Sequence, residues 1–330
     1  MLRLDDFYVW DSWVADDGDL YHLFFLQAPR SLGDPSMRHL RATVGHATSA
    51  DLVHWDYLGE CFGPAESGWD DLAIWTGSVA RGDDGRWRMY YTAISTRGGH
   101  VVKDQRIGVV ESDDLTIWRR VTDRPVLEVD TRWYRSLDED PTASETWRDP
   151  LVVRDPGGEG WHMLVTARGL GAGRNDDGVV GHARSDDMLT WTTGPPLCET
   201  GAGFGQLEVL QVREVDGQPL LVFTCHPQEQ TEERRKEWGD YCTWYVLGDA
   251  LLGPWDLSRA RPFEAEPDLF AAPLVQRRDG SWAFVGFRNL EPQGIHAFEI
   301  LDPIPVHVSD GELAADEAYL RDPHPHPSAR

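Results

Sequence analysis

The chain has 330 residues, 41% hydrophobic and 26% charged, and its formal net charge is −25 from 31 basic and 56 acidic residues. Such acidity argues against a nucleic-acid-binding protein, which needs a basic face, and against docking on an anionic membrane; no apolar run reaches the roughly 20 residues of a membrane span. At roughly 150 residues per domain the length predicts two domains, and the 15 Trp residues indicate either a large aromatic core or a surface that stacks on sugars.

The N-terminal segment Met1-Leu2-Arg3-Leu4 lacks the basic start and the apolar stretch of about 7–15 residues that are typical of a signal peptide. The cysteines are widely spaced and contain no CxxC pair, so we expect neither a disulfide framework nor a zinc site. Together these features predict a cytoplasmic protein with reduced, buried thiols. The four positions are Cys61, Cys198, Cys225 and Cys242.

Short apolar strands that follow glycine-containing turns recur along the whole chain. The first is 20–25, and the others are expected at 87–92, 161–166, 219–224 and 281–286. Asp-Gly dipeptides before four of these strands predict tight hairpins that join each strand to the one preceding it. These dipeptides are Asp17-Gly18, Asp84-Gly85, Asp216-Gly217 and Asp279-Gly280.

A longer phrase that begins with Gly and ends with Trp also repeats. It occupies 45–55, 108–118 and 181–191, with starts 63 and 73 residues apart, and a degraded copy covers 246–255. Units of this length that contain only strands are typical of propeller blades, and the Trp of each unit is expected to pack between blades. Five such units account for the chain, which predicts an all-β, five-bladed β-propeller forming a single catalytic domain over 1–330. The last ~28 residues would complete or wrap the final blade. Because the five units form one closed domain, this prediction replaces the two-domain expectation from chain length.

Carboxylates fall at matching places on the inner strands of three predicted blades. Counting nine residues back from each hairpin glycine gives Thr76, Asp149, Glu208 and Ala271, and a shorter first hairpin gives Asp11. Acidic residues are depleted in strands and costly to bury unpaired, so three that converge on one channel indicate a function. The alternatives are carboxylates that are solvated or paired with arginine, or a Ca²⁺ site, although no DxDxDG loop accompanies them.

Glycoside hydrolysis is the chemistry that fits this set of carboxylates. One carboxylate would act as nucleophile or base and another as proton donor, while the third would hold the sugar hydroxyls and stabilise the transition state. Crowding of like charges raises the pKa of at least one member, which keeps a proton donor available near neutral pH.

The residues resemble glycoside hydrolase families 32 and 68, five-bladed-propeller enzymes that act on β-fructofuranosides. Residues 9–13 resemble the nucleophile strand of the levansucrase family, and 21–25 and 45–55 resemble first-blade segments of the invertase family. Residues 75–78 are similar to the Trp-Ser-Gly-Ser stretch of the invertase family. Arg148-Asp149-Pro150 is the Arg-Asp-Pro motif of both, and it is the most specific match.

This resemblance implies that Asp11 is the nucleophile, Asp149 the transition-state stabiliser and Glu208 the acid/base. The chain departs from the families in three ways. The Asn-Asp-Pro-Asn and Glu-Cys contexts of the invertase family are absent, the charged acid/base context of the levansucrase family is missing, and no residues remain for a C-terminal β-sandwich.

The sequence therefore predicts a retaining β-fructofuranosidase, with fructosyl transfer as an additional outcome. An inverting, family 43-like arabinofuranosidase or xylosidase on the same scaffold is the main alternative, and a non-catalytic carbohydrate-binding propeller is a third. A separation of about 5–5.5 Å between the two reacting carboxylates favours retention, and about 6.5–9.5 Å favours inversion. A small carbohydrate is the expected partner, with no metal or other cofactor, whereas the particular glycoside and the oligomeric state stay open.

Residues near the three carboxylates are candidates for substrate binding, the Trp side chains by stacking on a sugar and the arginine by hydrogen bonding. Weaker loop candidates are Glu66, Trp69 and Asp70, and Trp147 also flanks the site. The charge run 228–237 is expected to be a solvated loop or short helix, and the 12 histidines to be structural or superficial. The predicted binding residues are Trp10, Ser12, Trp13, Gln27, Trp75, Thr76 and Arg148.

Overall fold

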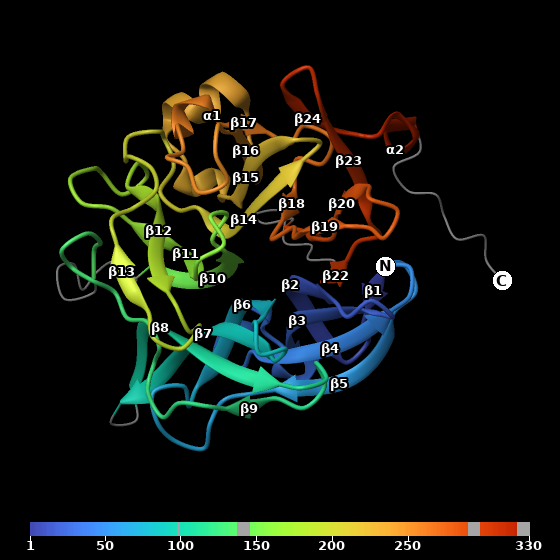
Figure 1. Ribbon diagram of the computed structural model, residues 1–330, viewed down its shortest axis with the longest axis vertical. Coiled ribbons are helices and arrows are strands. Elements are labelled where there is room, and N and C mark those ends of the chain that lie inside the picture. The colour runs from blue at the N-terminus through green and yellow to red at the C-terminus, as the bar shows by residue number, and fades with distance from the viewer. Residues whose placement is uncertain (98–99, 137–145, 290–297, 322–330) are drawn as a thin grey trace.

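The computed structural model describes residues 1–97, 100–136, 146–289 and 298–321. Within these residues the chain forms five four-stranded antiparallel sheets, which are arranged around a common centre in Figure 1. The protein is a five-bladed β-propeller, as the repeats predicted. Each sheet follows the chain from its innermost strand outwards, because hairpins join neighbouring strands.

The first three blades are continuous in sequence. Blade 1 contains β2 (Phe7–Asp16), β3 (Tyr21–Pro29), β4 (Thr43–Ser49) and β5 (Asp56–Phe62). Blade 2 contains β6 (Ala73–Arg81), β7 (Trp87–Arg97), β8 (His100–Ser112) and β9 (Arg119–Arg120). Blade 3 contains β10 (Trp147–Arg154), β11 (Trp161–Arg168), β12 (Gly178–Ser185) and β13 (Thr192–Gly194).

The last two blades are interrupted by shorter elements. Blade 4 contains β14 (Glu208–Val215), β15 (Gln218–Thr224), β16 (Thr243–Leu247) and β17 (Arg261–Pro262). Blade 5 contains β19 (Leu274–Gln276), β20 (Trp282–Phe284), β23 (Ile304–Ser309) and β24 (Glu312–Ala315), and β18 (Leu269–Phe270) pairs separately with β21 (Phe287–Arg288). The helices are α1 (Glu232–Trp238) and α2 (Glu317–Arg321), with 3₁₀ turns η1 (Arg30–Leu32), η2 (Pro35–Leu40), η3 (Pro227–Glu229) and η4 (Leu257–Arg259).

The two ends of the described chain meet at the fifth blade. Strand β1 (Leu2–Arg3) pairs antiparallel with β22 (Glu299–Ile300), so the first strand is hydrogen-bonded to a segment of the last blade. Strands β23 and β24 supply the outer half of blade 5, as expected for the residues after Asp302. The assignment of 1–330 to one domain stays a prediction, because 322–330 lie outside the described residues.

The recurring phrase folds into the same loop in blades 1, 2 and 3. In blade 3 the Ser185 hydroxyl accepts a hydrogen bond from the Met188 amide, and Asp187 accepts from the amides of Leu189 and Thr190. Met188 has a φ of 65°, and the corresponding residues of blades 1 and 2, Leu52 and Leu115, have 67° and 63°. Side-chain acceptors hold the tight turn that follows the third strand, which explains why the Ser and Asp repeat.

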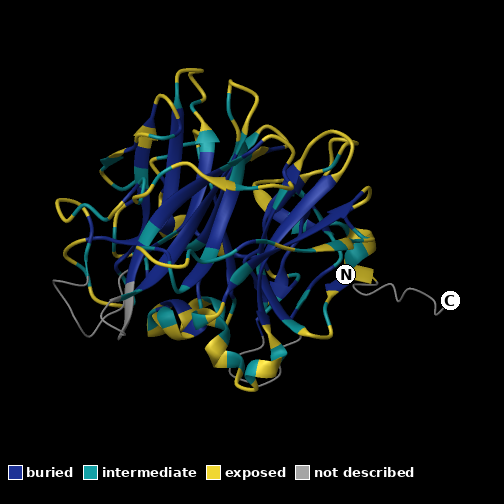
Figure 2. Ribbon diagram, turned by 90° about the horizontal axis from the view of Figure 1, so that it is seen from below, coloured by how far each residue is buried: buried dark blue, intermediate teal, exposed yellow. Residues whose placement is uncertain are grey.

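Two of the repeated Trp residues pack against the preceding blade, as predicted. The Trp118 ring of blade 2 meets the edge of Phe24 in blade 1 at 5.6 Å between centroids. The Trp191 ring of blade 3 lies at 5.7 Å from Tyr90 of blade 2 in the same edge-to-face geometry. In Figure 2 the strands are largely buried while the connecting loops are exposed, so most of the core lies between blades.

The four cysteines are free, and three of them are buried, which agrees with the absence of a disulfide framework. In the described part of the chain, no helix has the length and apolar character needed to cross a bilayer.

Candidate active site

A cavity of about 260 Å³ opens where the first halves of the inner strands meet. Every blade contributes to it, and the three predicted carboxylates all line its wall. Polar groups that converge on a concave space of this kind are typical of ligand sites. The lining residues are Trp10, Asp11, Leu26, Arg38, His39, Trp75, Thr76, Gln105, Arg148, Asp149, Gln206, Glu208, His226, Phe270, Phe287 and Asn289.

Irregularities in the inner strands place side chains at the cavity. The ladder between β2 and β3 shifts between Trp10 and Ser12, so that Asp11 is an unpaired, bulged residue with a φ of 29°. In β10 the ladder shifts after Arg148, and Asp149 has a φ of 56°. A bulge bends the strand and re-aims its extra residue, and Asp tolerates positive φ better than most residues. Strain of this kind is common at functional sites.

The register predicted for Glu208 is wrong by one residue. Glu208 pairs with Thr224 just before the bulge of β14, and Arg148 pairs with Thr166 at the corresponding place in β10. The bulged residue with positive φ in blade 4 is Val209, at 50°. The error arises because the hairpin of blade 4 is shorter: only residues 216–217 join its first two strands, whereas residues 82–86 do so in blade 2 and residues 155–160 in blade 3. Equal counts from the hairpin glycines therefore do not give equal ladder positions. Glu208 nevertheless lines the same cavity as Asp11.

Asp11 lies among both like and opposite charges. The Thr76 hydroxyl, from the equivalent position of blade 2, donates a hydrogen bond to its Oδ2. Burial raises the pKa of Asp11 to about 7; the Thr76 hydrogen bond opposes this rise, and the charges of Asp149 and Glu208 add to it. Burial in this cavity therefore makes ionisation of Asp11 costly, and a ligand that donates hydrogen bonds to the carboxylate would lower that cost.

Asp149 is the most enclosed of the three carboxylates. Its Oδ2 accepts hydrogen bonds from the Thr166 hydroxyl at 3.0 Å and from the Val209 amide at 3.3 Å, and its own amide donates to the Thr92 hydroxyl. Burial raises the pKa of Asp149 to about 6, while the guanidinium of Arg148 opposes the rise. These contacts to three blades fix the carboxylate in one orientation.

Arg148 connects two of the carboxylates. Its Nη2 donates to Glu208 Oε1 at 2.5 Å, and its Nε lies 3.4 Å from Asp149 Oδ2. The same Nη2 donates to the side-chain oxygen of Gln206. Arg148 thus orients the Glu208 carboxylate, and it also lines the cavity in which it is predicted to bind a sugar.

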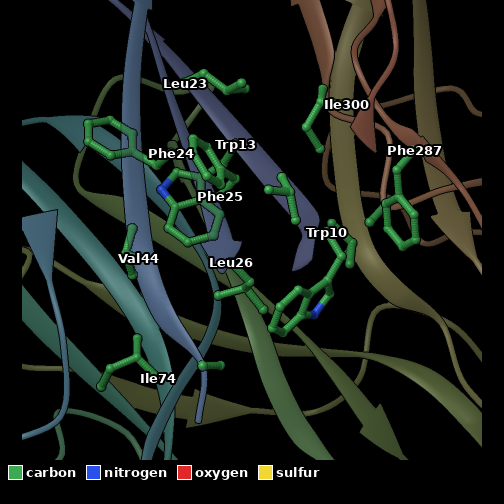
Figure 3. Close-up of a cluster of buried hydrophobic side chains, with 14 of the residues drawn as sticks. Trp10, Trp13, Leu23, Phe24, Phe25, Leu26, Val44, Ile74, Phe287 and Ile300 are labelled. Atoms are coloured by element: carbon green, nitrogen blue, oxygen red, sulfur yellow. The ribbon is translucent and has the colours of Figure 1, made fainter. Parts of the chain in front are cut away.

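Three predicted binding residues lie outside the cavity wall, which corrects the sequence-based interpretation. Trp13 is buried and stacks on Phe24 in the core, apart from Trp10, as Figure 3 shows. Ser12 is buried and donates to the Val285 carbonyl, and the Gln27 side chain accepts from the Tyr57 hydroxyl. Beyond the bulge at Asp11 the alternation of β2 resumes, so the next side chains point into the blade interfaces.

The flanking candidates also have structural contacts. Trp147 is fully buried against Tyr134. Asp70 is paired with Arg120 at 2.9 Å, Trp69 stacks on Tyr91, and Glu66 is exposed; none of the three lines the cavity. Trp10, Trp75 and Thr76, by contrast, are on its wall as predicted.

Sequence reasoning missed part of the cavity wall. Turn η2 carries Arg38 and His39, and the His39 carbonyl accepts from Trp75 Nε1 at 2.8 Å, which anchors the turn to blade 2. His226 and Asn289 come from the loops that follow β15 and β21. Loop residues have no register to count, so no periodic signal could have found these residues. The histidines at 39 and 226 are therefore not merely superficial.

In the described residues no group of three or more His, Cys, Asp or Glu side chains has the arrangement needed to hold a metal ion. The cavity carboxylates are separated instead by hydrogen-bond donors from Thr76, Thr166 and Arg148.

Comparison with protein families identifies a match over residues 14–287 to the glycosyl hydrolases family 32 N-terminal domain. The match includes Asp149 and Glu208 and begins three residues after Asp11. Beta-fructofuranosidase 1 of Zea mays is 27% identical over 202 residues, which are 60% of this chain and 28% of the maize protein. The probable sucrose-6-phosphate hydrolase of Vibrio cholerae is 26% identical over 285 residues, which are 84% of this chain and 46% of that protein. The chain thus spans less than half the length of these relatives.

Solved structures share the fold. The inulosucrase of Halalkalicoccus jeotgali, solved with kestose, superposes with a TM-score of 0.77 at 21% identity, covering 94% of this chain and 87% of that one. The GH32 beta-fructofuranosidase of Bombyx mori superposes with a TM-score of 0.68 at 17% identity, covering 94% and 64%. At such low sequence identities, these superpositions show that the chain shares the propeller fold.

Proposed function

Because the chain belongs to glycosyl hydrolase family 32, whose N-terminal domain it matches over residues 14–287, we propose that it cleaves β-fructofuranosidic bonds by a retaining double displacement. The observation that carries the proposal is the convergence of Asp11, Asp149 and Glu208 on one cavity of about 260 Å³. Sucrose, a fructo-oligosaccharide or a related fructoside is the proposed substrate. The names of the relatives from maize and Vibrio cholerae support this class.

In the first half of the reaction, Asp11 attacks the anomeric carbon of the fructosyl unit while Glu208 donates its proton to the glycosidic oxygen. The bond to the leaving group breaks as the bond to the Asp11 carboxylate forms. In the second half, Glu208 takes a proton from water, and the resulting hydroxide equivalent displaces Asp11. A sugar hydroxyl in place of water gives fructosyl transfer.

The contacts of the site suit these roles. Asp11 sits in a bulge whose backbone and Thr76 hydrogen bond hold the attacking oxygen in place. Asp149 is held by Thr166 and Val209 and can accept hydrogen bonds from fructosyl hydroxyls as positive charge develops at the ring. Arg148 stabilises the Glu208 carboxylate that is left once the proton has moved.

The cavity is partly open to solvent, so a leaving group attached to the fructosyl unit has room to extend out of it. Trp75 and His39 contact each other on the cavity wall and offer rings on which that group can stack.

The decisive test is a hydrolysis screen over sucrose, levan-type and inulin-type oligosaccharides and aryl arabinofuranosides, with NMR detection of the first-formed anomer. Retention at a β-fructoside supports the proposal. A first product of inverted configuration, or activity confined to arabinofuranosides, would instead assign the inverting pentofuranosidase mechanism.

The variant Glu208→Ala tests the acid/base role. We expect its kcat on sucrose to fall by about 10³-fold, and by much less on a fructoside whose leaving group needs no protonation. Azide should restore turnover and yield a fructosyl azide, because this anion needs no general base. Full activity of Glu208→Ala on sucrose would refute the assignment, whereas loss of activity in both Asp11→Ala and Glu208→Ala would exclude a purely carbohydrate-binding function.

A further inference from the structure

A second glutamate lies behind Glu208 and takes no part in the mechanism above. Glu229 ends turn η3, and its Oε1 accepts a hydrogen bond from the Gln206 amide nitrogen at 2.5 Å. Its other oxygen, Oε2, is buried without a hydrogen-bond partner. A buried carboxylate oxygen without a donor is costly, which suggests that the negative charge is retained for a purpose.

The hydrogen bonds from Glu229 lead to the proposed acid/base. A carboxylate only accepts hydrogen bonds, so the Gln206 amide must present its nitrogen to Glu229 and its oxygen to the other side. That oxygen accepts from Arg148 Nη2, the same nitrogen that donates to Glu208 Oε1. The orientation of the Gln206 amide therefore sets where the guanidinium lies.

The backbone keeps this arrangement in place. The Glu229 carbonyl accepts from the Gly205 amide at 2.7 Å, and Phe204 forms an isolated β-bridge with Gln230. The Gln230 side chain donates to the carbonyls of Cys225 and Tyr241. Glu229 and Gln230 of the charge run thus pack against the segment that precedes β14, and the later part of the run forms the expected short helix, α1.

Charge also links Glu229 to Glu208. Burial and the neighbouring Glu208 carboxylate raise the pKa of Glu229, whereas the positive charges of Arg148, His226 and Arg168 oppose this rise. Cys225 is the other titratable group that faces it. Glu229 thus lies within the electrostatic influence of both the Glu208 carboxylate and the Arg148 guanidinium.

We propose that Glu229 is a positioning residue: it orients Gln206 so that the amide oxygen holds Arg148 against Glu208, and its negative charge counterbalances that guanidinium. This role rests on the proposed function of Glu208 as proton donor. Glu229 itself is not on the cavity wall and does not touch the substrate.

Two variants separate the hydrogen bond from the charge. Glu229→Gln keeps an acceptor for Gln206 but removes the charge, so kcat should stay within about threefold of the unmodified protein. Glu229→Leu removes both, so kcat should fall about tenfold with KM little changed. Glu232→Gln, on the exposed face of α1, is the matched control and should change neither quantity.

Melting temperatures and a crystal structure of Glu229→Leu complete the experiment. The proposal requires Gln206 to turn and the Arg148 Nη2 to Glu208 Oε1 contact to be lost. It is overturned if that contact persists, if Glu229→Leu keeps the original kcat, or if the Gln variant loses as much activity as the Leu variant. Should the unmodified protein hydrolyse no fructoside, the proposed function fails, and the crystal structure still decides the role of Glu229.

Discussion

Two sets of aspartates in this propeller have opposite electrostatic environments. Asp187 of the repeated loop accepts backbone hydrogen bonds from Leu189 and Thr190, and although burial opposes ionisation these bonds lower its pKa to about 2. Asp11 and Asp149 lie in the cavity, where burial raises their pKa to about 7 and about 6. Ionisation of the repeated carboxylates stabilises the fold, whereas ionisation of the cavity carboxylates costs folding free energy.

The difference shows what repetition in a sequence indicates. Asp51, Asp114 and Asp187 occur at the same place in three blades because the same turn must be closed three times. Asp11 and Asp149 occupy the inner-strand position that blades 2, 4 and 5 fill with Thr76, Val209 and Ala271. A residue that differs from its counterparts in the other blades is thus the better indicator of chemistry, whereas a residue that recurs from blade to blade indicates a structural role.

The comparison would be tested most severely by Asp11→Asn. We expect kcat to fall by about 10⁴-fold or more, because the amide cannot act as nucleophile. The free energy of unfolding at pH 8 should be equal or higher. The raised pKa of Asp11 means that its contribution to stability is lost as pH rises from about 4 to about 7, and Asn has no such loss.

Activity on sucrose and chemical denaturation measure the two effects, with Asp56→Asn at an exposed site as control. A variant that loses stability at pH 8 by more than the control would mean that Asp11 is a structural carboxylate like those of the repeated loops.

The converse effect is expected for Asp187→Ala. Losing a side chain that accepts two backbone amides should lower the free energy of unfolding by about 1–2 kcal/mol, with kcat unchanged. Thermal unfolding checks this, and Asp186→Ala, the exposed neighbour, is the matched control. A large loss of kcat at unchanged stability would erase the distinction between the two sets.

The smallest effect concerns pH. The nucleophile must be ionised, so kcat/KM should fall about tenfold per unit as pH decreases below about 7, and more steeply below about 6 as Asp149 is protonated. Thr76→Val removes a hydrogen bond that favours the charged form, so its acid limb should move to higher pH. Circular dichroism over the same range excludes unfolding, and a flat profile between pH 5 and 8 would contradict the raised pKa values.

Periodic features of the sequence were enough to predict the architecture. The Asp-Gly hairpins, the recurring strands and the Gly-to-Trp phrase all report local geometry, which each blade repeats. The glycines that open this phrase are required by close packing: a Cβ at Gly45, Gly108 or Gly181 would lie closer than 3.0 Å to a side chain on the neighbouring strand. Such constraints act within one blade, between a strand and its neighbour in the chain, so each repeat of the sequence carries them.

The candidate site was predictable only in part. Asp11, Asp149 and Glu208 could be found because each interrupts an apolar inner strand, although the count that aligned Glu208 failed where hairpin lengths differ. Ser12, Trp13 and Gln27 were wrongly placed at the cavity because a bulge changes which side chains face it, and no propensity marks a bulge.

The sequence by itself determined the blade count, the strand-and-hairpin unit and the three carboxylates that depart from it. Only the tertiary structure decided how these carboxylates are arranged. It added Arg38, His39 and His226 to the cavity and aligned Glu229, Gln206 and Arg148 behind Glu208. The reason is physical: hairpins and turns are set by neighbours along the chain, whereas burial, charge coupling and shared hydrogen bonds arise between residues that ring closure brings together.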